Sequence, residues 1–254
     1  MSQHPDTTTT GRRNWGHRTS VWVLGFTLIA GTAVVTGSGA SGNDSSSARV
    51  LTATEEPLTS YRAFRRMHAK SEKFNQEGWL EAWTEFDATG FRYTIVNERG
   101  SDYVRNKVLK AVLRREQEIV AGGADRAALT EDNYTFTEAD GGEEGFRYVL
   151  LKPKRKDVML VEGRMVLSAD GADLLRVEGK LAKNPSFWTS LVNVIRHFAK
   201  LDGVRVPVST ESIAKVKFAG QSRLDVFYEY ESINGRPVSV AARQMLASAG
   251  TGTR

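Results

Sequence analysis

The sequence predicts an α+β fold: a curved antiparallel β-sheet forming an open half-barrel of about nine to eleven strands, with two or three helices covering its concave face. From residue 134 onward, apolar and polar residues alternate in successive segments. Turn pairs separate these segments: Asp170-Gly171, Asp202-Gly203 and Asn234-Gly235. Parallel pairing would need crossover helices, and the segments after residue 133 leave no room for them. The segments after residue 186 are long, about fifteen residues against a usual five or six, and long twisted strands with one apolar face curve.

The N-terminus has the three parts of an export signal. Residues 11–20 are basic, residues 21–35 form an apolar run, and Ser38 and Ala40 stand where a leader is cleaved. We therefore expect a signal peptide over 1–40, cleaved after Ala40, and a periplasmic or secreted protein. The alternative is a retained membrane anchor, for which the run is shorter than the ~20 residues that cross a bilayer. Residues 41–57 are rich in Ser, Gly and Thr and predict a flexible mature N-terminus.

Composition narrows the chemistry that is available. The chain has 254 residues, no cysteine and four histidines. Disulfides, thiolate metal sites, a cysteine nucleophile and a lipidated cysteine are thereby excluded. The net charge of +5 lies partly in the leader and gives little support for nucleic-acid binding. We expect no cofactor, no metal and no nucleic-acid partner.

The first half of the mature chain predicts two helices around two strands. Tyr61, Phe64, Met67 and His68 are three and four residues apart, which favours a helix over 58–74. Strands are expected at 78–86 and 91–98, separated by turn residues 87–90. The second helix is expected over 102–121, with Ser101 as its N-cap and an apolar stripe of valines, followed by a short helical or irregular stretch to residue 132.

The second half predicts strands and turns alone. We expect strands at residues 134–138, 146–152, 158–167, 174–181, 187–201, 204–218 and 223–232. The folded domain then covers 58–236, and residues 237–254 form a loose tail.

The long strands each have one face without charge. In the 187–201 strand this face carries Phe187, Thr189, Leu191, Asn193, Ile195, His197 and Ala199. Charge-free faces also run along 204–218 and 224–230. Such faces either pack fully against the helices or line an interior that accepts a hydrophobic ligand. The residues expected to line that interior are Phe91, Tyr93, Ile95, Leu191, Ile195, Val206, Val208, Val216, Phe218, Val226 and Tyr228.

The remaining histidine, basic and tryptophan residues could have functional roles, but structural roles are favoured for most of them. No G-x-S-x-G elbow is present, and a packed core histidine is the expected role of His197 rather than a catalytic base. The basic run Lys152, Lys154, Arg155 and Lys156 is either an ordinary hairpin loop or a tip that meets anionic lipid headgroups. Trp188 is expected to pack in the core, whereas Trp79 and Trp83 either pack or gate a cavity.

Two segments resemble the LolA/LolB-like superfamily of periplasmic lipoprotein and lipid carriers: residues 160–188 and 203–235. The first contains two adjoining strands and a Pro-Ser-Phe-Trp entry to a third, and the second contains a "G-v-x-l-P" strand and a strand ending in an acidic-aromatic run. The resemblance covers the architecture of residues 58–236. It implies an open barrel with helices as a lid and acyl chains held in its cavity. The helical insertion at 102–132 is larger than a minimal carrier of this kind needs.

These observations lead to three functional hypotheses. The first is a non-enzymatic periplasmic carrier for a lipid or lipoprotein acyl chain, with peripheral membrane contact at most after leader cleavage. The second is an interaction or sensor domain for an envelope protein partner, with its sheet filled by the helices. The third is a hydrolase without a recognised motif.

Overall fold

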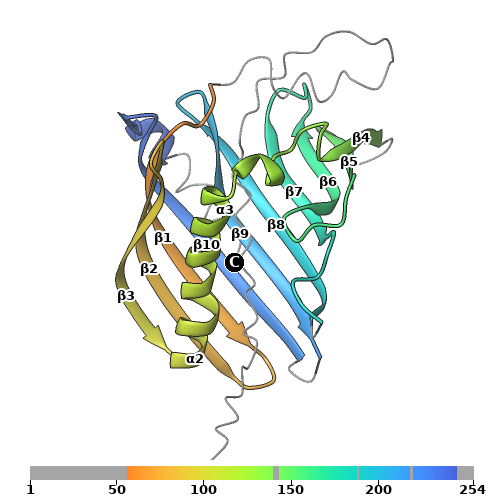
Figure 1. Ribbon diagram of the computed structural model, residues 1–254. Coiled ribbons are helices and arrows are strands. Elements are labelled where there is room, and N and C mark those ends of the chain that lie inside the picture. Colours follow the sequence, from red (N-terminus) through yellow and green to blue (C-terminus); the bar gives the residue numbers. More distant parts are fainter. Residues whose placement is uncertain (1–55, 140–142, 188, 218–219, 245–254) are drawn as a thin grey trace, which may run out of the picture.

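The computed structural model describes residues 56–139, 143–187, 189–217 and 220–244. They form an eleven-stranded antiparallel sheet in the order β3-β2-β1-β10-β9-β8-β7-β6-β5-β4, and β11 pairs with β10. The sheet is curved but not closed, with β3 and β4 as its edges (Figure 1). The predicted fold class is confirmed.

The strands have the following bounds: β1 Tyr61–Ser71, β2 Gln76–Asp87, β3 Gly90–Gly100, β4 Tyr134–Ala139, β5 Phe146–Pro153, β6 Val161–Ser168, β7 Leu174–Leu181, β8 Thr189–Leu201, β9 Val204–Val216, β10 Gly220–Ile233 and β11 Arg236–Pro237. From β4 to β10 each strand pairs with the next, as the turn residues predict. Asp202 and Asn234 adopt positive φ, followed in each turn by a glycine that does the same.

The helix expected over residues 58–74 is wrong, because most of this segment is strand β1. Its side chains alternate in burial, with Ala63, Arg65, Met67 and Ala69 inside. β1 pairs with β2 on one side and with the distant β10 on the other. The inward Arg65 interrupts the apolar alternation that marks a strand, so the three-and-four spacing of neighbouring apolar residues favoured a helix.

One continuous helix follows β3 directly. It consists of α2 (Asp102–Val104), a π-helical turn η1 (Arg105–Leu109) and α3 (Lys110–Ala121). The Ser101 hydroxyl accepts the N–H of Val104, and the helix ends at Gly122, as predicted. A short 3₁₀ turn, η2 (Ala124–Ala127), comes next. We call α2, η1 and α3 together the cover helix.

The concave face carries two apolar clusters. One lies between the cover helix and β1, β2, β9 and β10, where the helix crosses the sheet (Figure 1). The other lies on β4 to β9 and includes Ala127 of η2 and Met159 and Leu160 from the segment between β5 and β6. The cover helix, η2 and the segment between β5 and β6 therefore pack on the concave face of the sheet.

The tail expected to be loose after residue 236 is packed as far as the structure describes it. Val238 and Ala242 are buried in the cluster beneath the cover helix. The side chain of Asp202, in the β8–β9 turn, accepts hydrogen bonds from the N–H and hydroxyl of Ser239, which precedes a helical turn at 240–244. Apolar contact and this hydrogen-bonded anchor fix a segment that its small residues suggested was free.

The predicted leader, cleavage site and nearly all of the flexible segment 41–57 lie outside the described residues. Within the part that the structure describes, no helix is long and apolar enough to cross a membrane.

Candidate functional site

Most of the residues expected to line the sheet interior do face it. Phe91 (β3), Val206 (β9), Val226 and Tyr228 (β10) are buried together beneath the cover helix. The partly buried Tyr93, Ile95 and Val208 pack against the same cluster, and Val216 packs against the neighbouring one. Phe218 lies outside the described residues.

The prediction of which face of β8 lines the interior is wrong. Val192, Val194 and Phe198 are buried on the opposite face, and Leu191 and Ile195 alternate with them as partly buried residues on the outside. The charge-free face was expected inside, but the inner face carries the buried Arg196, whose charge lies among tyrosines. His197 alternates with Arg196 and is consequently exposed, not a core histidine.

An ion pair joins strand β1 of the sheet to the C-terminal half of the cover helix. Arg65 of β1 and Glu116 of α3 each have 1% of their side chain exposed. The contact is two-pronged: Nη1 of Arg65 donates to Oε2 of Glu116, and Nη2 donates to Oε1 at 2.8 Å. The hydroxyl of Tyr61 accepts from Arg65 at 2.7 Å and lies 3.4 Å from Oε1 of Glu116, to which it donates. The pair is therefore enclosed and hydrogen-bonded by its own elements.

Aromatic rings surround the guanidinium of Arg65. It lies 4.6 Å from the ring centre of Tyr228 and 5.1 Å from that of Phe91. Burial is the largest single influence and opposes its charge, but the Glu116 carboxylate together with Tyr61 and Tyr228 outweighs that cost and raises the pKa of Arg65 well above its usual value. Burial also raises the pKa of Tyr61 and of Tyr230. The site holds a permanent cation among neutral phenols.

A second arginine lies in the same buried region. Arg196 of β8 is 1% exposed, and its Nε donates to the hydroxyl of Thr210 at 3.1 Å. Burial lowers the pKa of Arg196, with a further contribution from the positive charge of Arg65, while Glu116 opposes the shift. Among the described residues, the two buried arginines, Arg65 and Arg196, thus both interact electrostatically with one buried glutamate, Glu116. We call Arg65, Glu116, Arg196, Tyr61 and Tyr228 the buried charge cluster.

The sequence contains a signal for this cluster, but it is readable only after β1 is recognised as a strand. With 61–71 extended, Arg65 occupies an inward position between Ala63 and Met67. Glu116 lies three and four residues from the buried Leu113 and Val112 on the helix stripe. Each of these two elements therefore has one charged residue among its buried apolar positions. Because the two charges are opposite, this pattern predicts that the side chains of Arg65 and Glu116 meet.

More exposed contacts hold the edge of the cover helix to β3. Glu98 accepts from Lys110 at 2.8 Å and from Arg105 at 3.0 Å, and all three side chains are partly exposed. Gln117 donates to the backbone carbonyl of Phe91 at 3.2 Å. These contacts join the cover helix to β3.

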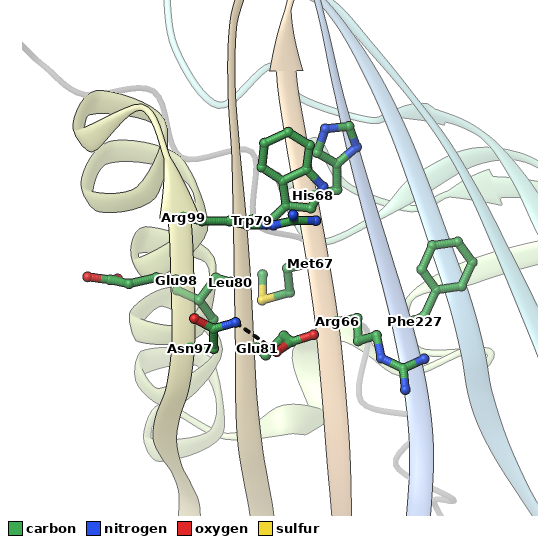
Figure 2. A pocket seen from close by; sticks show the side chains of 10 residues that line it. All are labelled: Arg66, Met67, His68, Trp79, Leu80, Glu81, Asn97, Glu98, Arg99 and Phe227. Carbon is green, nitrogen blue, oxygen red and sulfur yellow. Dashed lines mark hydrogen bonds between the residues drawn. The ribbon is translucent and has the colours of Figure 1, made fainter.

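The outer face of the sheet has a shallow depression of about 370 Å³. Figure 2 shows its side chains, from β1, β2, β3 and β10. His68 and Trp79 stack with ring centres 4.7 Å apart, and Arg99 lies 4.5 Å from the Trp79 ring. Phe227, 55% exposed, forms another part of the rim. Trp79 and Trp83 therefore stand on the outer face and do not gate the concave side; Trp188 is outside the described residues.

The basic run divides into structural and exposed members. Arg155 donates to the side chain of Asn133 at 2.5 Å and to the carbonyl of Arg126 at 2.6 Å, and it pairs with Asp157. Lys152, Lys154 and Lys156 are exposed. Within the described ranges, no group of three or more His, Asp or Glu side chains is placed to hold a metal ion.

No protein-family model matches the chain, and no curated protein matches it. Among solved structures it is similar to a DUF1329 family protein from Desulfovibrio piger, at 8% sequence identity and a TM-score of 0.32, over 72% of this chain and 87% of that one.

Proposed function

We propose that this chain is an exported, non-enzymatic binding protein that holds the acyl chain of a lipid or lipoprotein on the concave face of its sheet. The site is the apolar and aromatic surface beneath the cover helix, lined by Phe91, Val206, Val226 and Tyr228. The observation that carries the proposal is the way this surface is closed: one helix covers it, and an ion pair from the C-terminal half of that helix anchors it, rather than apolar packing alone.

The physical chemistry of that anchor supports a removable cover. Removing two charges from water costs several kcal/mol per ion, so a buried ion pair is often no more stabilising than apolar residues of similar volume. Leucine or methionine at positions 65 and 116 would hold the helix at least as well. The ion pair instead fixes the helix in one specific position on the sheet, and the helix can move away when that single contact is replaced.

The surrounding structure supports the same conclusion. The cover helix is connected to β3 without a loop at its start, and it contains a π turn, a feature frequent at functional sites. The sheet is open at both edges, so an acyl chain could enter without separating paired strands. The predicted leader supports export, and exposed Lys152, Lys154 and Lys156 support contact with an anionic membrane surface.

The proposal is tested by native mass spectrometry of the purified full chain, before and after organic extraction, with identification of the extracted lipids. Stoichiometric acyl-chain ligand that is lost on extraction supports it. A clean apo mass, together with no binding of a fluorescent fatty acid, contradicts it.

A second candidate is an interaction domain that works through its outer face. The observation in its favour is the depression around Trp79 and Phe227, because exposed aromatic and arginine side chains are enriched where proteins meet. For this candidate the concave face stays filled. Phe227→Ala would then abolish capture of an envelope partner, and it would leave acyl-chain binding unaffected if the first proposal holds.

A further inference from the structure

We propose that the ligand is an anionic amphiphile whose head group replaces the Glu116 carboxylate on Arg65 when the cover helix moves away. This inference rests on the proposed function and names the class of ligand that the same site accepts. It starts from the placement of a permanent cation, 1% exposed, at the centre of the surface that the acyl chain would occupy.

Lifting the cover helix would leave a charge behind on the sheet. Glu116 leaves with the helix, and Arg65 remains among Tyr61, Phe91 and Tyr228. An uncompensated charge in such surroundings is strongly unfavourable, and breaking a buried pair by removing one partner is strongly destabilising. A purely apolar ligand that displaced the helix would bear this cost in full.

The seat that Glu116 would vacate has the geometry of an anion site. Arg65 presents two nitrogens to Glu116 in a two-pronged contact, and the hydroxyl of Tyr61 stands beside it as a third group. This arrangement fits any carboxylate or phosphate, because the guanidinium fork matches the oxygen spacing of both. A ligand anion would restore the contacts that Glu116 makes in the closed form.

The electrostatic field around the seat has the sign that favours an anion. Arg196 lies in the same buried region, and the positive charge of Arg65 contributes to the lowered pKa of Arg196. With Glu116 gone, the two buried arginines favour an anion and disfavour a cation. The apolar residues Val206 and Val226 belong to the cluster beneath the same cover helix and suit an alkyl chain. Head and tail of an amphiphile therefore have separate places on one surface.

The test compares ligands that share one alkyl chain. Laurate and dodecyl phosphate carry an anionic head, dodecanol a neutral one, and acetate is an anion without the chain. Calorimetric titration of the full-length protein should show laurate and dodecyl phosphate binding at least about tenfold more tightly than dodecanol, because a hydrogen bond to a charged group is stronger than one to a neutral group. Acetate should not bind measurably.

The variant that isolates the anion seat is Arg65→Met combined with Glu116→Leu. It replaces the pair by apolar residues, which preserves folding and removes the seat. Laurate should lose its advantage over dodecanol, and dodecanol should bind more tightly than to the wild-type protein, since lifting the helix no longer exposes a charge. Circular dichroism confirms that the variant is folded.

The matched control is Glu98→Gln. It weakens the exposed contacts to Lys110 and Arg105 that hold the same helix, but leaves the buried charge cluster intact. The affinities for laurate and for dodecanol should rise by a common factor. The ratio of the laurate affinity to the dodecanol affinity therefore stays at its wild-type value.

The outcomes separate the two proposals. Equal binding of laurate and dodecanol to the wild-type protein overturns the anion inference and leaves the acyl-chain proposal standing. A laurate preference that survives in the double variant also overturns the inference, because the anion then binds elsewhere. Tight binding of acetate alone overturns the amphiphile class. Binding of none of the alkyl ligands contradicts the proposed function itself.

Discussion

At the scale of single residues, the main feature is a pair of opposite charges buried between the sheet and the cover helix, where apolar side chains would cost less free energy. Arg65 and Glu116 are each enclosed by the elements that carry them, and they satisfy one another through a two-pronged contact. Their value to the protein lies in specificity, since the free energy gained from the contact is offset by the cost of desolvating both groups.

Breaking this pair from one side should be far more harmful than removing it. Arg65→Met leaves the Glu116 carboxylate buried without its cation, and we expect the free energy of unfolding to fall by about 3–5 kcal/mol. Arg65→Met with Glu116→Leu should restore it to the wild-type value or above. Urea unfolding of the three proteins measures this. A double variant as unstable as the single one would show that the pair is a net source of stability.

Tyr134 should make stability depend on alkaline pH. Burial raises the pKa of Tyr134 from an ordinary value of 10 to about 12, and its oxygen accepts the N–H of Val161 at 3.0 Å. The folded pKa lies above the unfolded one, so this contribution to stability is fully present below pH 10 and is lost as pH rises towards about 12.

The Tyr134→Phe variant should show a smaller loss of stability between pH 10 and about 12 than the wild-type protein. Tyr103, 54% exposed on the cover helix, provides the control, because Tyr103→Phe should leave the alkaline dependence unchanged. Unfolding midpoints measured across this pH range test both. Identical pH profiles for Tyr134→Phe and the wild-type protein would mean that Tyr134 does not set the dependence.

At the scale of elements, a pair of glycines allows two strands to approach closely. Gly163 of β6 and Gly179 of β7 are direct cross-strand partners. A Cβ added at Gly163 would lie 2.0 Å from the carbonyl oxygen of Glu178 and 2.6 Å from Cα of Gly179, which are backbone atoms that cannot rotate away. The pair marks a place where only hydrogen fits between the strands.

We therefore expect Gly163→Ala to lower the free energy of unfolding by about 1–3 kcal/mol, the usual cost of overpacking. Thermal unfolding of the variant measures the effect. An exposed change on the edge strand β4, Thr137→Ala, serves as the control and should have a small effect. A Gly163→Ala protein as stable as that control would contradict the close approach of β6 and β7.

Elements also show what the sequence could and could not predict. The cover helix was predicted with its N-cap and end residue because Ser101 and Gly122 act locally. The segment 61–71 was mistaken for a helix because the inward Arg65 interrupts its apolar alternation, and because one of its two partner strands, β10, is more than 150 residues away in the sequence.

Some residues of the candidate site could also be predicted from the sequence and others could not. Phe91, Val206 and Tyr228 were correctly expected inside, since uniform alternation identifies their faces. Leu191 and Ile195 were placed on the wrong face of β8, because the criterion was absence of charge and the true inner face holds Arg196. Buried charges are the hardest site residues to find from sequence, since they are compensated only by partners on other elements.

At the scale of the whole molecule, the sheet presents two very different surfaces. The concave side is apolar with a charge cluster at its centre, and the outer side carries rows of paired charges with aromatic rings between them, such as Arg62 over Trp83 and Arg66 beside Glu229. Exposed ion pairs of this kind contribute little to stability, about 0–1 kcal/mol each, and they keep a long open sheet hydrated. Binding of an acyl chain is therefore expected inside and not on the outer rows.

The location of a bound acyl chain tests this account most directly. A fatty acid carrying a photoreactive diazirine is bound to the full-length protein, cross-linked by light and mapped to single residues by mass spectrometry. We predict labels on inner-face residues beneath the cover helix, Val206 and Tyr228 on the sheet and Val112 on the helix. Labels confined to outer-face residues such as Trp79 and Phe227 would contradict the account and favour a protein whose concave face stays closed.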